Sequence, residues 1–163
     1  MQPDIKRILY CTDLSENSKY ACRYALYLAC KTDAEIHVLF VAEKPSPDAM
    51  VTLETYMRDF GGREQFLKKR LDQAKEMLSN QMKQYFSSLP DDEKPGADRI
   101  KALNVCESDP VDEILKQSER LKCDLIVMGT HHKGVAYTFL GSVSKKVMSN
   151  TRIPVMVVPL PKT

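Results

Sequence analysis

Five short stretches rich in apolar and β-branched residues are spread along the chain and predict five β-strands. They cover residues 5–11, 35–41, 100–106, 124–128 and 153–158. The runs LIVM and VMVV in the last two stretches are continuously apolar rather than alternating, which is typical of parallel strands covered by helices on both faces. The pattern therefore predicts a parallel sheet buried between two helical layers.

Apolar residues at helical spacing fill the segments between these strands. Residues 15–30 carry small and apolar side chains on one face behind Ser15, a favourable N-cap. Residues 63–86 repeat apolar side chains at steps of three and four, as an amphipathic helix does. Asp109, which precedes a proline, and Ser142 have the capping chemistry of two further helix starts. Helices are therefore expected in all the gaps between strands.

The strict alternation of strands and helices predicts the fold class. The chain is expected to form an α/β protein with a doubly wound, mostly parallel five-stranded sheet and helices on both faces, a Rossmann-like architecture. Residues 44–62 and 89–98 carry no regular pattern, and we expect a flap beside the binding site and a linker, respectively. The length of 163 residues fits one domain covering residues 1–163.

The amino-acid composition limits the kinds of binding partner that we expect for this protein. Hydrophobic residues make up 43% and charged residues 28% of the chain, as in folded globular proteins, and the net charge of +2 does not favour nucleic acid. No apolar run reaches the roughly 20 residues that cross a bilayer, and the start lacks the apolar core of a leader sequence. The five scattered cysteines include no C-x-x-C pair, which indicates reduced thiols and no structural metal. We therefore expect a cytoplasmic protein that contacts neither nucleic acid nor membrane.

Candidate binding residues lie where the predicted strands end. In doubly wound sheets, ligands bind beyond the carboxyl ends of the strands, at the point where the strand order reverses. Thr12 and Asp13 follow the first strand, Val41 ends the second, and the glycine-containing residues 129–134 follow the fourth. The last stretch opens like a P-loop but lacks the following Lys and Ser or Thr, and no G-x-G-x-x-G follows the first strand. These observations exclude a Walker-type NTPase and disfavour a dinucleotide-dependent enzyme.

The Gly-Ser pair at residues 141 and 142 favours an anion site at a helix start. The free N–H groups of Ser142, Val143 and Ser144, together with the Ser142 hydroxyl, suit a phosphate group. Asp13 has two open interpretations, because a carboxylate there could contact a ligand or cap the helix that follows.

Several stretches resemble the universal stress protein family. That family carries a strand ending in Thr-Asp and a late glycine-rich stretch, G-x2-G-x9-G-[ST], that clasps ATP. The matching stretches here are ILYCTDLSENS and VMGTHHKGVAYTFLGSVSKKV, and the terminal strand IPVMVV and the turn ESDPVDEI are also similar to the family. The resemblance implies a fold like that of the adenine nucleotide α-hydrolases and a bound ATP, ADP or AMP, which Mg²⁺ could accompany.

The implied site has an adenine pocket, which includes the backbone of Val41, and a phosphate loop. Its residues are Cys11, Thr12, Asp13, Val41, Met128, Gly129, Thr130, His132, Gly141, Ser142, Val143 and Ser144. The resemblance also implies a homodimer formed through the C-terminal strand, residues 153–158. The pattern agrees, because no later strand is available to pair with the apolar outer edge of that segment.

These features lead us to expect a stress-response or signalling protein that binds an adenine nucleotide. No convergent catalytic base, nucleophile or carboxylate pair is evident, so any ATP hydrolysis is expected to be slow. One alternative is a dimeric interaction module without nucleotide binding, because the spacing from Gly129 to Gly141 is one residue shorter than in the family and His132 replaces or displaces a glycine. A weaker alternative is a nucleotide-dependent transferase that uses Lys133 or a histidine.

Overall fold

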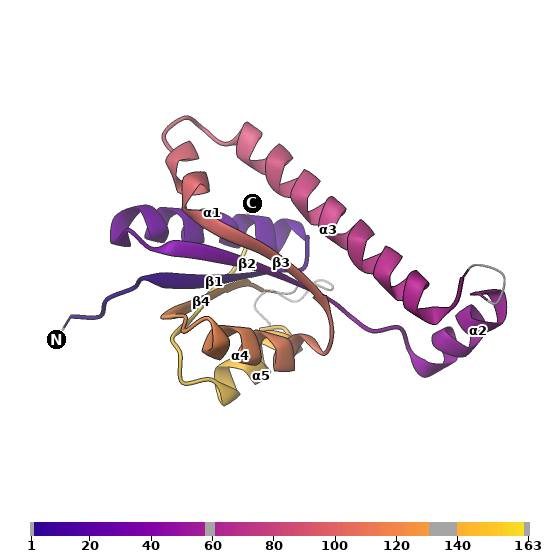
Figure 1. Ribbon diagram of the computed structural model, residues 1–163. Helices are drawn as coiled ribbons and strands as arrows, with labels where there is room; N and C mark the ends of the chain where they lie inside the picture. The colour runs from indigo at the N-terminus through magenta and orange to yellow at the C-terminus, as the bar shows by residue number, and fades with distance from the viewer. Residues whose placement is uncertain (1, 58–60, 131–139, 162–163) are drawn as a thin grey trace.

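The computed structural model describes residues 2–57, 61–130 and 140–161, and five parallel strands form its sheet (Figure 1). The strands are β1 (Arg7–Thr12), β2 (Glu35–Ala42), β3 (Ile100–Glu107), β4 (Leu125–Gly129) and β5 (Val155–Val158). The helices are α1 (Glu16–Thr32), α2 (Pro47–Met57), α3 (Arg63–Ser88), α4 (Pro110–Arg120) and α5 (Ser142–Asn150), with a 3₁₀ helix, η1, at Lys94–Arg99. The strand order is β3-β2-β1-β4-β5. This arrangement confirms the predicted doubly wound α/β fold.

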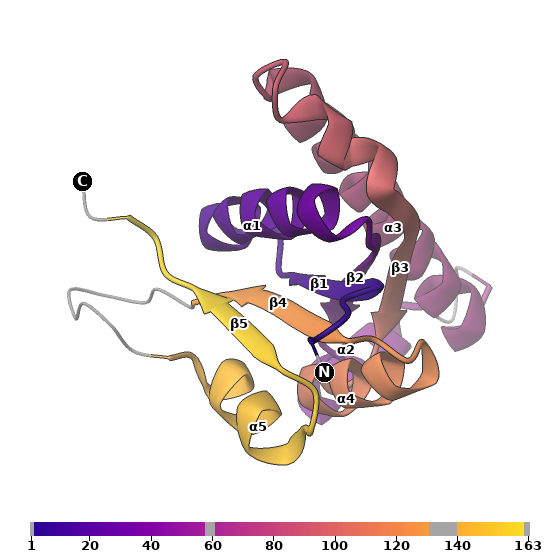
Figure 2. The same ribbon diagram turned by 90° about the vertical axis from the view of Figure 1, so that its left-hand side faces the viewer.

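Helices cover both faces of the sheet, α1 and α3 on one side and α4 and α5 on the other (Figures 1 and 2). Successive residues of β1 therefore enter different cores. Ile8 and Tyr10 pack with α1 and α3, whereas Leu9 and Cys11 pack with α4 and α5, and all four are buried. Two-sided burial explains why the strands are apolar without alternation.

The strand order reverses beside β1, and this sets the position of the site. The chain moves from β1 through β2 to β3 at one edge, and then crosses back to place β4 on the other side of β1. The connections that leave β1 and β4 therefore diverge to opposite faces of the sheet and leave a crevice beyond their carboxyl ends.

Segment 44–62 is only partly irregular, so the prediction of a flap without regular structure is wrong for Pro47–Met57, which form α2. The Ser46 hydroxyl accepts a hydrogen bond from the Ala49 N–H at 3.2 Å, and Pro47 occupies the first helical position. These are standard start signals, but the weak apolar periodicity that follows them hid the helix. The predicted linker similarly contains η1. Figures 1 and 2 show α2 beyond the carboxyl ends of the strands.

Two predictions near the C-terminus also need correction. Ser142 is the first residue of α5 and not its cap, since Gly141 occupies the N-cap position with no side-chain hydrogen bond. The predicted strand 153–158 is shorter than expected, because Ile153 donates its N–H to the Thr151 hydroxyl and pairing with β4 covers only Val155–Val158. Ser15 and Asp109 do cap α1 and α4 as predicted, each accepting from the backbone three residues ahead.

Candidate functional site

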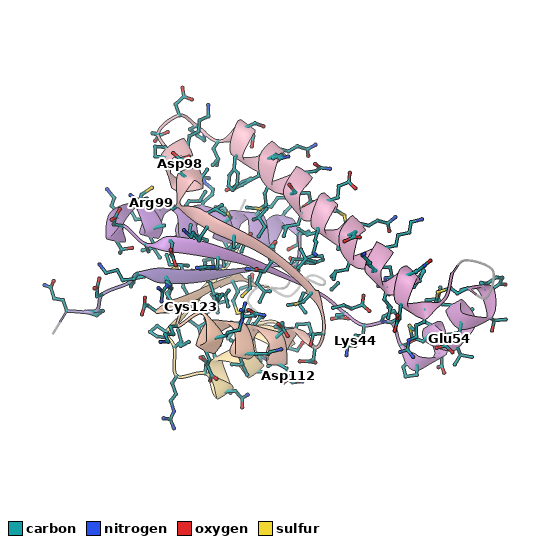
Figure 3. All side chains as sticks on the ribbon, in the orientation of Figure 1. Lys44, Glu54, Asp98, Arg99, Asp112 and Cys123 are labelled. Atoms are coloured by element: carbon teal, nitrogen blue, oxygen red, sulfur yellow. The ribbon has the colours of Figure 1, made fainter. Side chains whose placement is uncertain are left out.

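A cavity of about 510 Å³ lies at the carboxyl edge of β1, β2 and β4, in the crevice where the strand order reverses. In Figure 3, Lys44 and Asp112 lie toward the carboxyl ends of the strands, and Asp98, Arg99 and Cys123 lie toward the amino ends. Within the described residues the cavity is lined by Cys11, Thr12, Asp13, Ser18, Leu39, Phe40, Val41, Ala42, Glu43, Pro110, Ile114, Met128, Gly129, Thr130, Gly141, Ser142, Val143 and Ser144.

The cavity brings the predicted site residues together. Each predicted site residue within the described ranges lines it, although these residues come from β1, β2, β4 and α5 and the loops beside them. His132 lies outside the described residues, as do Lys133 and His131, the groups considered for a transferase. The structure therefore assembles one site from segments that are far apart in the sequence.

The apolar wall and the mouth of the cavity contain residues that the sequence did not predict as part of a site. Leu39 and Ile114 are buried, and they contribute to the core between the sheet and the α4–α5 layer. Their apolar periodicity marked them as core residues, with no signal that this core opens at the strand ends. Ser18 and Glu43 also line the cavity, and their closeness in sequence to Ser15 and Val41 was the available clue.

Thr12 is held by hydrogen bonds within the protein. Its side-chain oxygen accepts from the Leu14 N–H at 3.0 Å and lies 2.9 Å from the Ser18 hydroxyl. Ser18 donates its own proton to the Ser15 carbonyl, so Thr12 is the donor to Ser18. The Thr12 proton is therefore already used, and the hydroxyl is left to act as an acceptor toward a ligand.

Asp13 occupies the turn between β1 and α1. Its carboxylate accepts from the Ser15 N–H at 3.0 Å and also from the Ser15 hydroxyl, so it stabilises the start of α1 while lining the cavity. Partial burial raises the pKa of the Asp13 carboxyl, but the hydrogen bonds it accepts, including those from Ser15 and Ser18, together lower it by more, and the pKa lies below its ordinary value. Asp13 is consequently an anion near neutral pH. Both interpretations of this residue are compatible with its geometry.

The charged residues that line the described part of the cavity, Asp13 and Glu43, are both acidic. Positive potential must then come from other groups in this part of the site. The first turn of α5 presents N–H groups that have no partner within the helix, and its nine residues align their dipoles toward the cavity. Ser142 and the buried Ser144 stand in this turn. An anionic group is therefore best accommodated at the start of α5.

The end of β4 packs closely against the start of α1. A Cβ atom on Gly129 would lie 2.8 Å from the carbonyl oxygen of Asn17, so only glycine fits without a backbone shift. Asn17 also donates its side-chain amide to the Thr130 carbonyl at 2.7 Å. The hydroxyl of Thr130 is buried and has no hydrogen-bond partner within the described part of the chain. Packing against α1 thus explains why residue 129 is a glycine, independently of any ligand.

Cys11 is part of the apolar wall. Burial raises the pKa of its thiol far above the ordinary value, and the pKa of Cys123 is raised to about 11 for the same reason. Because thiolates are the reactive form, these side chains behave as apolar groups.

Across the described ranges, no three His, Cys, Asp or Glu side chains are grouped as metal ligands, and no helix has the length and apolarity to span a membrane.

Comparisons with known proteins agree with this architecture. The sequence profile of the universal stress protein family matches residues 4–159. The universal stress protein MJ0531 of Methanocaldococcus jannaschii is 29% identical over 158 residues, which span 96% of this chain and 84% of that protein. The solved structure of protein MJ0577 from the same organism has a TM-score of 0.70 and 25% identity, with 98% of this chain and 99% of that chain covered.

Two less similar structures share the fold and contain nucleotides. One is a universal stress protein in complex with cAMP, with a TM-score of 0.55, 18% identity and coverage of 95% of this chain and 97% of that chain. The other, from Archaeoglobus fulgidus, is in complex with dAMP, with a TM-score of 0.50, 15% identity and coverage of 96% and 99%. The family profile extends over nearly the whole chain, and the fold and the relatives agree with it. The chain therefore belongs to the universal stress protein family.

Proposed function

We propose that this protein binds an adenine nucleotide in the cavity beside β1 and acts in stress response or signalling through its bound state, as a cytoplasmic homodimer. The observation that carries the proposal is the cavity itself, which joins the strand-end residues Thr12, Asp13 and Val41 to the free N–H groups at the start of α5. Two proteins of the same fold are solved with cAMP and dAMP, which supports an adenine nucleotide as the ligand class.

The two ends of the cavity suit the two ends of a nucleotide. Leu39, Met128 and Ile114 are buried and apolar and offer a surface for a base, next to the backbone of Val41. Asp13 supplies a charged acceptor for ribose hydroxyl groups. The phosphate is assigned to Gly141, Ser142 and the following N–H groups, where the helix dipole favours negative charge. ATP, ADP and AMP share these features.

Mg²⁺ enters this proposal only on the nucleotide. Within the described residues, the side-chain carboxylates that line the cavity are Asp13 and Glu43, which are too few for a dedicated protein site. Mg²⁺ commonly binds through substrate phosphates with one or two carboxylates. It is therefore expected to strengthen ATP or ADP binding more than AMP binding, because it neutralises the additional phosphate charge.

Isothermal titration calorimetry with ATP, ADP, AMP and cAMP, each with and without Mg²⁺, tests the proposal. We expect at least one of these nucleotides to bind with a stoichiometry of about one per chain, in the common micromolar to millimolar range. GTP provides the matched control for the base. Absence of heat and of competition at millimolar concentrations of all four adenine nucleotides would refute nucleotide binding.

A second candidate function is a dimeric interaction module that does not bind nucleotide. The charged residues that line the described part of the cavity, Asp13 and Glu43, favour this second function. Both are acidic, and their negative charges would repel a polyphosphate. The same titrations distinguish the two functions. Lack of nucleotide binding by a protein that still sediments as a dimer supports the interaction module.

A further inference from the structure

The first turn of α1 holds the ends of β1 and β4 beside the cavity through buried polar side chains. Asn17 and Ser18 are neighbours in this turn, with only 7% and 3% of their surfaces exposed. Burial of an amide or a hydroxyl is unfavourable unless the group forms hydrogen bonds. The partners of these two side chains therefore indicate what the buried positions are for.

Ser18 binds the end of β1. Its side-chain oxygen pairs with Thr12 at 2.9 Å, and its carbonyl oxygen accepts from the Tyr10 hydroxyl at 2.6 Å. Tyr10 and Thr12 belong to β1 itself and are also buried. This side of the network keeps the end of β1 and the start of α1 together.

Asn17 binds the other side of the cavity. Its amide donates to the carbonyl oxygen of Thr130 at 2.7 Å, across 113 positions of sequence. The Asn17 backbone is also the surface against which Gly129 packs without a side chain. One residue of α1 thus contacts the end of β4 through both its backbone and its side chain.

The strand order shows at which end of the cavity the hydrogen bond between Asn17 and Thr130 lies. Because β1 lies between β2 and β4, Val41 and Thr130 stand on opposite sides of it. After Thr130 the chain continues to Gly141, and both residues line the cavity on the same side as α5. The Asn17 hydrogen bond therefore fixes the carbonyl group of Thr130, at the end of β4, in the part of the cavity that α5 also lines.

We infer that Asn17 is a positioning residue for the phosphate end of the cavity. It orients the carbonyl group of Thr130 and holds the end of β4 in place beside the part of the cavity that the first turn of α5 lines. The inference rests on the proposed nucleotide binding, and it assigns to Asn17 no contact with the ligand. It follows that loss of the side-chain amide weakens ligands that carry a phosphate and leaves the bare nucleoside unaffected.

The test compares AMP with adenosine in three proteins. Asn17→Leu removes the amide with little change of volume and no change of charge. Asn150→Leu is the matched control, since Asn150 also donates its side-chain amide to a backbone carbonyl at 2.7 Å, but within the last turn of α5. Affinities are measured by calorimetry, or by competition where binding is weak. Circular dichroism and urea unfolding establish that each variant is folded.

We expect Asn17→Leu to weaken AMP binding about 10-fold and to change adenosine binding less than about twofold, since one buried hydrogen bond commonly contributes that much. Asn150→Leu should match the wild type for both ligands. Should Asn17→Leu not fold, Asn17→Ser, whose shorter side chain cannot reach Thr130, is used for the same comparison.

Three results would overturn the inference. In the first, the folded Asn17 variant binds AMP as the wild type does. In the second, the variant loses AMP and adenosine binding equally, which would make Asn17 a general structural residue. In the third, the wild type binds neither compound, which removes the AMP site that the inference requires, while the proposed function is then decided by the titrations with ATP, ADP and cAMP. In the first two results the wild type still binds nucleotide, so the proposed function is unaffected.

Discussion

At Gly141, the effect of a substitution on the fold can be separated from its effect on nucleotide binding. Gly141 has a φ of −58° and a ψ of 159°, which are accessible to any residue, so a side chain there introduces no backbone strain. Its place at the N-cap of α5 puts a new side chain next to the N–H groups assigned to the phosphate. The two effects of a substitution can therefore be measured independently.

Gly141→Val is expected to abolish nucleotide binding and to leave the fold intact, because a branched side chain occupies the space that the phosphate needs. Gly141→Ala serves as a graded control and should retain weak binding. The readouts are calorimetry with AMP or ATP and the urea unfolding midpoint. Wild-type affinity in a folded Gly141→Val protein would show that the phosphate is bound elsewhere.

The Asp13 carboxylate provides a pH-dependent test at the same scale. Its pKa is lower in the folded protein than in the unfolded chain, so its contribution is complete above the unfolded value of about 3.9 and is lost as the pH falls through the folded pKa. The free energy of unfolding of the wild type should exceed that of Asp13→Asn near neutral pH, and the difference should shrink as the pH falls below the unfolded pKa of about 3.9. Urea titrations over this range measure it. A difference that does not vary with pH would mean that the charge of Asp13 contributes nothing.

At the scale of elements, helix starts position the cavity as much as the strand ends do. The start of α4 contributes Pro110 and Ile114 to the lining, and Asp109 caps that helix by accepting from the Asp112 N–H at 3.0 Å. The cap and the cavity lie within one helical turn of each other. Disruption of the cap should therefore affect both stability and the site.

Asp109→Ala is expected to lower the free energy of unfolding by about 1 kcal/mol, since the cap loses its acceptor and the first turn of α4 frays. Asp109→Asn keeps an oxygen acceptor and should stay within a few tenths of a kcal/mol of the wild type, roughly as other caps do. Urea unfolding at neutral pH measures both variants. Equal stability of wild type and Asp109→Ala would show that water replaces the cap without loss.

For the whole molecule, the open question is how the edge of the sheet is protected. β5 is an edge strand of the described sheet, and Figure 2 shows it at the border beside α5. Val155, Met156 and Val157 are half-buried, although they are apolar and lie in an ordered strand. An apolar edge with unpaired backbone groups is well suited to pairing with a second copy about a two-fold axis.

Val157→Lys is therefore expected to convert a dimer into a monomer, because a charge at the centre of the paired edge has to be desolvated. Sedimentation velocity distinguishes the monomer from the dimer. The protein concentration should be roughly tens of micromolar, which is above the dissociation constants of ordinary homodimers. Lys101→Ala, at the opposite edge strand β3, is the control and should not alter assembly. A monomeric wild type, or a Val157→Lys protein that stays dimeric, would remove β5 as the interface.

Much of the fold could be predicted from the sequence, because local signals and global architecture agree. Continuous apolar strands, capped helices and short connections leave few alternatives to a doubly wound sheet. Two of the discrepancies, those in α2 and α5, have local causes. In α2, the start signal of Ser46 and Pro47 was not followed by an apolar stripe, and in α5 the cap position belongs to Gly141 because the helix begins one residue earlier than Ser142 alone suggested.

The sequence by itself determined the fold class and which strand ends carry the candidate site, because both depend on periodicity and on residue types at fixed places along the chain. Only the tertiary structure decided how that site is enclosed. Leu39 and Ile114 have the same pattern as other core residues, and Asn17 and Thr130 are 113 positions apart, so no local signal relates them. Their contacts arise from packing α1 and α4 against opposite faces of one sheet, which is a property of the assembled layers.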